Sequence, residues 1–337
     1  MIQRLGAGTL LFENMPRVAG YAAVVGKKES EGPLGGLFDK VIFDSRGGAP
    51  TFEEAESLLQ REAASLALEK AGVHAADIDY AFAGDLLNQC VGTSFGLLDF
   101  GIPHLGQYGA CSTMAQSLAM GAVFTESGAA HRALCVTSSH FCAAQRQYRF
   151  PMEYGEVRTP TAQWTVTGAG CCVLAREGGS VGVRAATVGR IRDLQITDAN
   201  NMGAAMAPAA ASTLCAYFDD TGDKPEAYDR IITGDLGYVG SELLLEWCER
   251  LGHPMPRARM MDCGLTIYDP AQDSHAGGSG CGCSAVVLSS YILPRLQSGE
   301  WRRVLFMATG ALLSPTTSQQ GETIPGVAHA VVIEGVQ

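Results

Sequence analysis

The sequence has no run of apolar residues long enough to cross a membrane, and this absence sets the first limit on its function. No stretch approaches the roughly 18 uninterrupted apolar residues that a membrane-spanning helix needs. The first residues, from Met1 to Gly6, also lack the apolar core of a signal peptide. We therefore expect no signal peptide and no transmembrane segment, in a chain that faces the cytoplasm or attaches peripherally to a membrane.

Positive charge is scarce as well. The chain has 24 Lys and Arg against 35 Asp and Glu, which gives a formal net charge of −11. Nucleic acid and anionic membrane surfaces repel an acidic protein of this kind. We therefore expect no nucleic-acid partner, and an anionic ligand would need a local basic or dipolar pocket.

The cysteine spacing typical of metal sites is absent, although the chain has 11 Cys. No Cys-x-x-Cys pair occurs, and Cys171-Cys172 and Cys281-Gly282-Cys283 have no second ligand pair near them. We therefore expect no metal site. The cysteines lie inside apolar stretches and their number is odd, which indicates reduced thiols in a cytosol-like compartment.

What the chain does have is a corner of small residues that opens a buried helix. Gly109-Ala110-Cys111-Ser112 is followed from Ala115 by apolar residues at helical spacing. Cys111 is therefore predicted at the start of a buried helix, where free N–H groups and the helix dipole favour a thiolate or a bound anion. The alternative is that Cys111 is a small core residue.

The order of strands and helices occurs twice along the chain. Gly84-Asp85-Leu86 and Gly234-Asp235-Leu236 each follow a short predicted strand, and residues 127–134 align without gaps on residues 298–305. These matches predict a duplicated α/β chain with halves at 1–177 and 178–337. Strands joined by helical crossovers further predict mixed, largely parallel sheets with helices on their faces.

A duplicated α/β chain with a cysteine at the first buried-helix start resembles the thiolase superfamily. This resemblance implies two similar halves in five α-β-α-β-α layers and a homodimer, with a broad face buried beside the predicted strand 132–137. Within the superfamily the chain resembles the AD family of stage V sporulation proteins of endospore-forming bacteria. The stretches that carry this second resemblance are Tyr108 to Thr113, Thr137 to His140 and Pro160 to Gly170.

The sporulation resemblance implies a function that composition and spacing do not. It implies binding of dipicolinic acid (pyridine-2,6-dicarboxylic acid), free or as its calcium chelate, with no other cofactor. It also implies a part in moving this acid into the developing spore, at the forespore or spore inner membrane. The partners implied there are other stage V sporulation membrane proteins.

One departure from the superfamily's enzymes favours binding over catalysis. Condensing enzymes place a histidine after the second-half strand that is here 230–233, where this chain has Gly234-Asp235-Leu236-Gly237. Cys111 keeps one possible partner, His275, in a late Gly-rich turn, but acyl transfer needs a complete set. The alternatives are an acyl-CoA-using condensing enzyme or thiolase with Cys111 as nucleophile, or a scaffold whose pocket is a relic.

The predicted ligand site lies between the Cys111 helix and the end of strand 132–137, because α/β proteins bind ligands at such strand ends. An arginine of the Arg146 to Arg149 stretch is expected to pair with one carboxylate of the ligand. Trp164 offers a ring face, with plain core packing as its alternative, and Asp85 and Asp235 are interpreted as structural caps. The predicted ligand-binding residues are Cys111, Ser112, Ser138, Ser139, His140, Arg149, Gln163 and His275.

Overall fold

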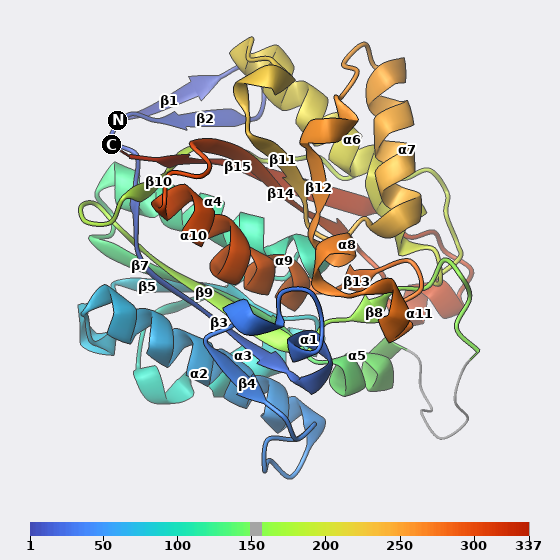
Figure 1. Ribbon diagram of the computed structural model, residues 1–337, viewed down its shortest axis with the longest axis horizontal. Helices are drawn as coiled ribbons and strands as arrows, with labels where there is room; N and C mark the ends of the chain where they lie inside the picture. The colour runs from blue at the N-terminus through green and yellow to red at the C-terminus, as the bar shows by residue number, and fades with distance from the viewer. Residues whose placement is uncertain (149–156, 337) are drawn as a thin grey trace.

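Two sets of five strands with the same strand order form the frame of the molecule in the computed structural model, which describes residues 1–148 and 157–336 (Figure 1). The two sets, called here the first and the second sheet, are joined where Gly182 pairs with Arg17. The first sheet has the order β3 (Arg17–Gly26), β9 (Gly168–Ala175), β7 (Arg132–Ser139), β5 (Tyr80–Gly84) and β6 (His104–Gly106). The second has the order β10 (Val181–Thr187), β15 (Gly326–Gly335), β14 (Arg303–Ala311), β11 (Arg230–Thr233) and β12 (Met260–Asp262). In each sheet the last three strands are parallel and the second runs antiparallel to them, so the sheets are mixed as predicted.

Helices separate and cover these sheets, which gives five layers (Figure 1). The first sheet is covered outside by α2 (Phe52–Ala71) and α3 (Val91–Gly96), and the second by α6 (Met202–Thr221) with α7 (Gly237–Arg250) packed against it. Between the sheets lie α4 (Thr113–Ser127), α9 (Cys281–Val287) and α10 (Leu293–Gln297). The predicted α-β-α-β-α arrangement is confirmed, and the largest apolar cluster fills its central layer.

The repeat extends to individual hydrogen bonds. The Asp79 carboxylate accepts from the backbone N–H groups of His131 and Arg132, at 2.6 and 3.0 Å. In the other half the Asp229 carboxylate accepts from the N–H groups of Arg302 and Arg303, again at 2.6 and 3.0 Å. Both aspartates thus stabilise the turn into the strand beside them, β7 or β14, which is strong structural support for a duplicated unit.

The shorter elements connect the layers. They are α1 (Lys27–Ser30), α5 (Phe141–Tyr148), α8 (Cys263–Ile267), α11 (Pro315–Gln319), β1 (Ile2–Leu5), β2 (Thr9–Phe12), β4 (Lys40–Ile42), β8 (Trp164–Thr165) and β13 (Gly278–Ser279). The N-terminal strand β2 pairs with β10, so the start of the chain extends the second-half sheet. The parallel pair of β8 and β13 bridges the two halves near the start of α4. Within the described residues, no helix is both long and apolar enough to span a bilayer.

Several helix ends follow from the sequence, and one does not. The spacing of Thr51 and Glu54 and the glycine at position 72 predict the two ends of a helix. In the structure Thr51 caps α2 by accepting from the Glu54 N–H, and Gly72 ends it in the left-handed conformation. Ser241 likewise predicts a helix cap, but α7 begins earlier, at Gly237. The reason is that the Asp262 carboxylate accepts from the N–H groups at this helix start, and Asp262 lies on a neighbouring strand.

Candidate functional site

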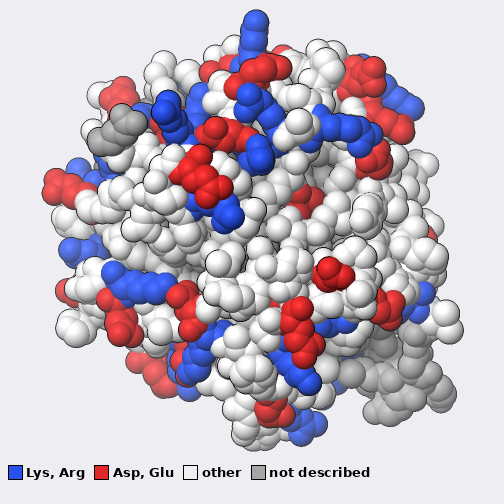
Figure 2. Space-filling view, in the orientation of Figure 1, with Lys and Arg blue, Asp and Glu red and all other residues white. Residues whose placement is uncertain are grey.

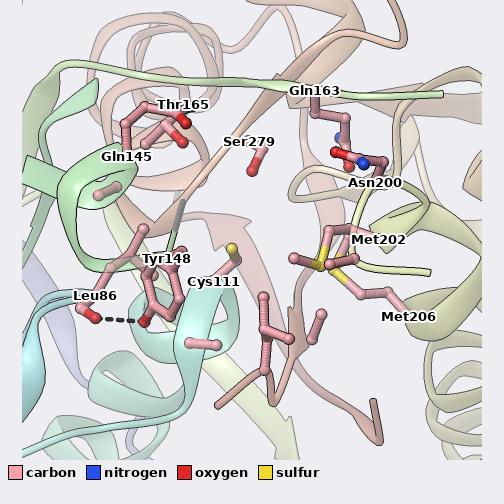
Figure 3. A pocket seen from close by; sticks show the side chains of 15 residues that line it. Leu86, Cys111, Gln145, Tyr148, Gln163, Thr165, Asn200, Met202, Met206 and Ser279 are labelled. Atoms are coloured by element: carbon pink, nitrogen blue, oxygen red, sulfur yellow. Dashed lines mark hydrogen bonds between the residues drawn. The ribbon is translucent and has the colours of Figure 1, made fainter. Parts of the chain in front are cut away.

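A pocket lies where the two halves meet, at the start of α4 (Figure 3). Its volume is about 90 Å³, and since one buried water needs roughly 10–15 Å³ on the same measure, a small ring fits. Figure 3 shows Cys111, Tyr148, Met202 and Ser279 around one common space. The lining residues are Leu86, Ala110, Cys111, Ala144, Gln145, Tyr148, Gln163, Thr165, Ala199, Asn200, Met202, Met206, Ser279, Ala311 and Leu313.

The predicted corner before Cys111 is present and is held from both halves. Ala110 has φ of 50°, a left-handed value that is uncommon for a residue other than glycine. The Ser112 hydroxyl donates to the Gly109 carbonyl at 2.6 Å, so Ser112 closes this turn. Gly310 on β14 packs so closely that a Cβ there would lie 2.5 Å from the Gly109 oxygen. The corner thereby fixes the Cys111 side chain at the junction of the halves.

The thiol of Cys111 lies beside the carboxyl of Asp235, to which it donates a hydrogen bond. Burial, and then the negative charge of Asp235, raise the pKa of Cys111 well above its usual range. The sequence predicts that the helix start favours a thiolate or a bound anion, and the raised pKa argues against the thiolate. Burial beside a carboxyl group opposes the helix dipole at this position.

Asp235 is fully buried, and its carboxyl is held in place by other donors. The Thr309 hydroxyl donates to it at 2.9 Å and the Gly280 N–H at 3.0 Å. Burial raises the pKa of Asp235 to about 7, because these donors only partly offset the loss of hydration. Asp235 thus does more than cap a strand end, since its charge also raises the pKa of Cys111.

Gln163 is the second predicted residue that the structure brings to this pocket. Its Nε2 donates to the carbonyl oxygens of Asp235, at 2.7 Å, and Gly278, at 3.0 Å. Its Oε1 is buried and accepts no hydrogen bond from the described residues. Gln163 therefore carries, beside the pocket, a buried acceptor without a partner among the described residues.

The two serines at the end of β7 do not line the pocket. Ser138 donates to the buried Glu56 carboxyl at 2.9 Å. Ser139 donates to the Val166 carbonyl at 2.6 Å and accepts from the Gly282 N–H at 3.1 Å. Both hydroxyls have partners inside the fold, so the structure separates them from Cys111.

His140 likewise faces another part of the molecule. It borders a groove between the 27–47 loop and α2. Its Nε2 lies 2.8 Å from the Ser45 carbonyl oxygen, which can only accept, so Nε2 carries the proton. Burial lowers the pKa of His140, and its ring lies 5.5 Å from that of Phe52.

His275 is a turn residue outside the pocket. Its Nδ1 lies 2.7 Å from the Thr159 carbonyl oxygen and its Nε2 lies 2.9 Å from the Asp273 carboxylate. Both His275 and Asp273 have left-handed backbone conformations, with φ of 52° and 55°. This geometry does not bring His275 to Cys111, so it supplies no imidazole partner for the thiol.

The predicted arginine and tryptophan also lie outside the described pocket. Arg146 pairs with Glu53 at 2.7 Å, and Arg149 lies outside the described residues. Trp164 stacks on Phe141 with ring centroids 3.9 Å apart. None of the pocket-lining residues in the described part of the chain carries a charge, and no group of three His, Cys, Asp or Glu side chains there is placed to hold a metal ion.

Sequence reasoning missed most of the pocket wall. Tyr148 comes from α5 and Met202 and Met206 from α6, while Thr165 and Ser279 are paired partners in the β8–β13 ribbon. The one signal that was available is the repeated Gly-Asp-Leu, which marks Asp235 without showing its contact with Cys111. The contact arises because the fold brings the start of α4, from the first half, against the end of β11, from the second half.

Comparison with solved structures defines the class of protein. The chain resembles a variant of OleA from Xanthomonas campestris with a TM-score of 0.62 and 16% identity, covering 96% of this chain and 99% of that one. It also resembles 3-oxoacyl-[acyl-carrier-protein] synthase III from Aquifex aeolicus, with a TM-score of 0.58 and 14% identity over 95% and 99% of the two chains. The chain therefore has a thiolase-like fold.

Comparison of sequences identifies the family of this chain. Residues 6–334 match the family model of stage V sporulation protein AD. The chain is 45% identical over 329 residues to stage V sporulation protein AD of Bacillus subtilis, covering 98% of this chain and 97% of that protein. The chain belongs to the stage V sporulation protein AD family.

Proposed function

We propose that this chain is a non-catalytic binding protein for dipicolinic acid and that the Cys111 pocket holds the ligand. The observation that carries the non-catalytic part is the contact between Cys111 and Asp235. Acyl transfer needs a thiolate and a base, whereas burial beside a carboxyl group raises the pKa of this thiol. Family membership supports a role in sporulation, and the choice of ligand rests on what the family resemblance implies.

The apolar wall of the pocket suits a planar ring. The ring of Tyr148 faces the cavity while its hydroxyl donates to the Leu86 carbonyl at 2.6 Å. Across the space lie the thioethers of Met202 and Met206 (Figure 3). Aromatic and sulfur-containing side chains contact ring faces and edges favourably, so this wall would hold a pyridine.

The polar groups of the pocket suit the carboxylates of the ligand, which they would bind by hydrogen bonds and not by an ion pair with a charged side chain. Thr165 and Ser279 carry hydroxyl donors and Asn200 an amide donor, and the N-terminal turns of α4 add a partial positive charge. The unused Oε1 of Gln163 is an acceptor for a proton or a calcium ion on the ligand. We therefore include the free acid and its calcium chelate in the proposal.

Equilibrium titration of the protein with dipicolinate, with and without calcium, tests the proposed ligand. Benzene-1,3-dicarboxylate is the matched control, because it has the same shape and charge but no ring nitrogen. We expect saturable binding of dipicolinate at one site per chain and at least tenfold weaker binding of the control. Equal weak binding of both acids would leave the ligand assignment without support.

The alternative is a condensing enzyme or thiolase that uses Cys111 as its nucleophile. Incubation with acetyl-CoA or malonyl-CoA followed by mass spectrometry separates the two functions. A binding protein gains no acyl group on Cys111 during many hours of incubation. A stoichiometric adduct that Cys111→Ala removes, together with turnover, would establish the enzyme instead.

We further propose a homodimer that forms at the free edge of the first sheet. The expected face was beside strand 132–137, but that strand is β7, which is paired on both sides by β5 and β9. The edge strand is β6, where Leu105 is 42% exposed. The neighbouring Phe95, Leu98 and Tyr108 are also exposed, so this edge offers both backbone groups and apolar surface to a second copy.

We also propose that the protein attaches to other stage V sporulation membrane proteins at the forespore or spore inner membrane. The support is family membership together with the absence of a spanning helix in the described residues. Fractionation of sporulating cells tests the attachment. The protein should sediment with membranes when those partners are present and remain in the supernatant when they are deleted.

A further inference from the structure

Two cysteines face each other between the outer helices of the second half. Cys215 lies on α6 and Cys248 on α7, and these helices pack side by side (Figure 1). Both side chains belong to the same apolar cluster. Cys248 is the side-chain hydrogen-bond partner that acts on the Cys215 thiol, so the two thiols are neighbours within this cluster.

The two thiols differ in their access to solvent. Cys215 is 6% exposed and borders a surface groove that Trp247 and Leu251 also line. Cys248 is completely buried in the apolar cluster. A small reagent that enters the groove therefore reaches Cys215 first.

They also differ in acidity. The hydrogen bond from Cys248 lowers the pKa of Cys215, and the same bond together with burial raises the pKa of Cys248. The pKa values of the other nine cysteines are all raised, chiefly by burial. Because the thiolate is the reactive form, Cys215 is the cysteine of this chain best suited to attack an oxidant.

We propose that Cys215 and Cys248 are a redox-active dithiol, which hydroperoxides oxidise to a disulfide that joins α6 to α7. In the first step the Cys215 thiolate attacks one peroxide oxygen, an S–O bond forms, the O–O bond breaks and the leaving hydroxide takes up a proton. In the second step the Cys248 sulfur attacks that of Cys215, an S–S bond forms, and hydroxide leaves with the Cys248 proton as water. With hydrogen peroxide, two thiols and one peroxide give one disulfide and two waters.

A second facing pair in the core provides an internal control. Cys135 and Cys172 are opposite each other in the register of β7 and β9. Both have no exposed surface and both have raised pKa values. These two cysteines are paired in the sheet, but neither thiol is exposed to solvent or has a lowered pKa. We therefore expect this pair to stay reduced.

The test is peptide mapping of the folded full-length protein after treatment with hydrogen peroxide, with unreacted thiols alkylated before digestion. We expect one dominant cross-linked peptide that joins Cys215 to Cys248 and that dithiothreitol reverses. Cys248→Ser should leave Cys215 as a sulfenic acid that dimedone traps, whereas Cys215→Ser should abolish both products. Cys135→Ser should change neither.

Two results would overturn the proposal. One is that Cys215 stays reduced in the folded protein while other cysteines, such as the half-buried Cys142, are oxidised. The other is that Cys215 is oxidised but forms no cross-link to Cys248, even though circular dichroism shows the native fold. In the second case Cys215 would be an accessible thiol and not part of a dithiol.

Discussion

Asp85 and Asp235 occupy equivalent positions in the two halves, and the carboxyl of Asp235 is the one that lies beside the Cys111 thiol. Each follows the second-to-last strand of its sheet, β5 or β11. Asp85 accepts from the Leu87 N–H and from both the N–H and the hydroxyl of Thr93. Asp235 accepts from Cys111 as well as from Thr309 and Gly280. Asp85 thus stabilises the local structure of the first half, whereas Asp235 contributes to the pocket beside Cys111.

This difference predicts the reactivity of Cys111. Asp235→Asn removes the negative charge beside the thiol and should lower its pKa, with about a tenfold gain in thiolate for each pKa unit. Alkylation of Cys111 by iodoacetamide near pH 8, followed by mass spectrometry, should be at least tenfold faster than in the parent protein. Asp85→Asn is the matched control and should leave the rate unchanged. Equal rates in all three proteins would show that Asp235 does not hold the proton on Cys111.

The raised pKa of Asp235 also predicts a dependence of stability on pH. Its pKa is about 7 in the folded state against an ordinary 3.8, so between these values the unfolded chain has lost a proton that the folded chain keeps. The free energy of unfolding therefore falls as the pH rises through this window, by up to about 1.4 kcal/mol per pH unit from this group alone. Above pH 7 the contribution is constant.

Denaturant unfolding of the parent protein and Asp235→Asn between pH 4 and pH 9 measures this contribution. The stability of the variant relative to the parent should increase from pH 4 to about pH 7 and then level off. A difference that does not vary with pH would mean that Asp235 titrates normally in the folded protein.

The proposed dimer edge predicts the effect of one charge. Leu105→Lys places a charged side chain on the exposed strand β6 and should convert the dimer to a monomer in sedimentation at micromolar concentration. Leu251→Lys is the matched control, because Leu251 is 50% exposed at the end of α7, away from this edge. If Leu105→Lys sediments like the parent dimer, the interface lies elsewhere.

Local rules and the internal repeat predicted the frame of the molecule from the sequence. The cap at Thr51, the stop at Gly72 and the strand at Arg230–Thr233 depend on neighbouring residues, and the structure has them where they were expected. The start of α7 at Gly237 was missed because its cap, Asp262, belongs to another strand. The strand β15 and the hairpin of β1 and β2 were also not predicted.

The site was harder to predict because its contacts join distant segments. Cys111 and Gln163 do meet at the pocket, but Ser138 and Ser139 at the end of β7 and His140 just after it have their partners elsewhere in the fold. The prediction that these residues lie at a strand end was correct. A position at a strand end does not, however, determine which cavity a side chain enters. The helix start predicted a position that favours a thiolate or a bound anion, because the sequence does not show the carboxyl that lies beside Cys111.

The most direct test of the account is calorimetric titration of dipicolinate into the parent protein and into Met206→Trp. Met206 lies on α6 in the pocket wall, and the larger indole would fill the cavity of about 90 Å³. His140→Ala, outside the pocket, is the control. The account predicts binding by the parent and His140→Ala, and at least a tenfold loss of affinity in a folded Met206→Trp. Unchanged affinity in Met206→Trp, or its loss in His140→Ala alone, would contradict the assignment of the ligand to the Cys111 pocket.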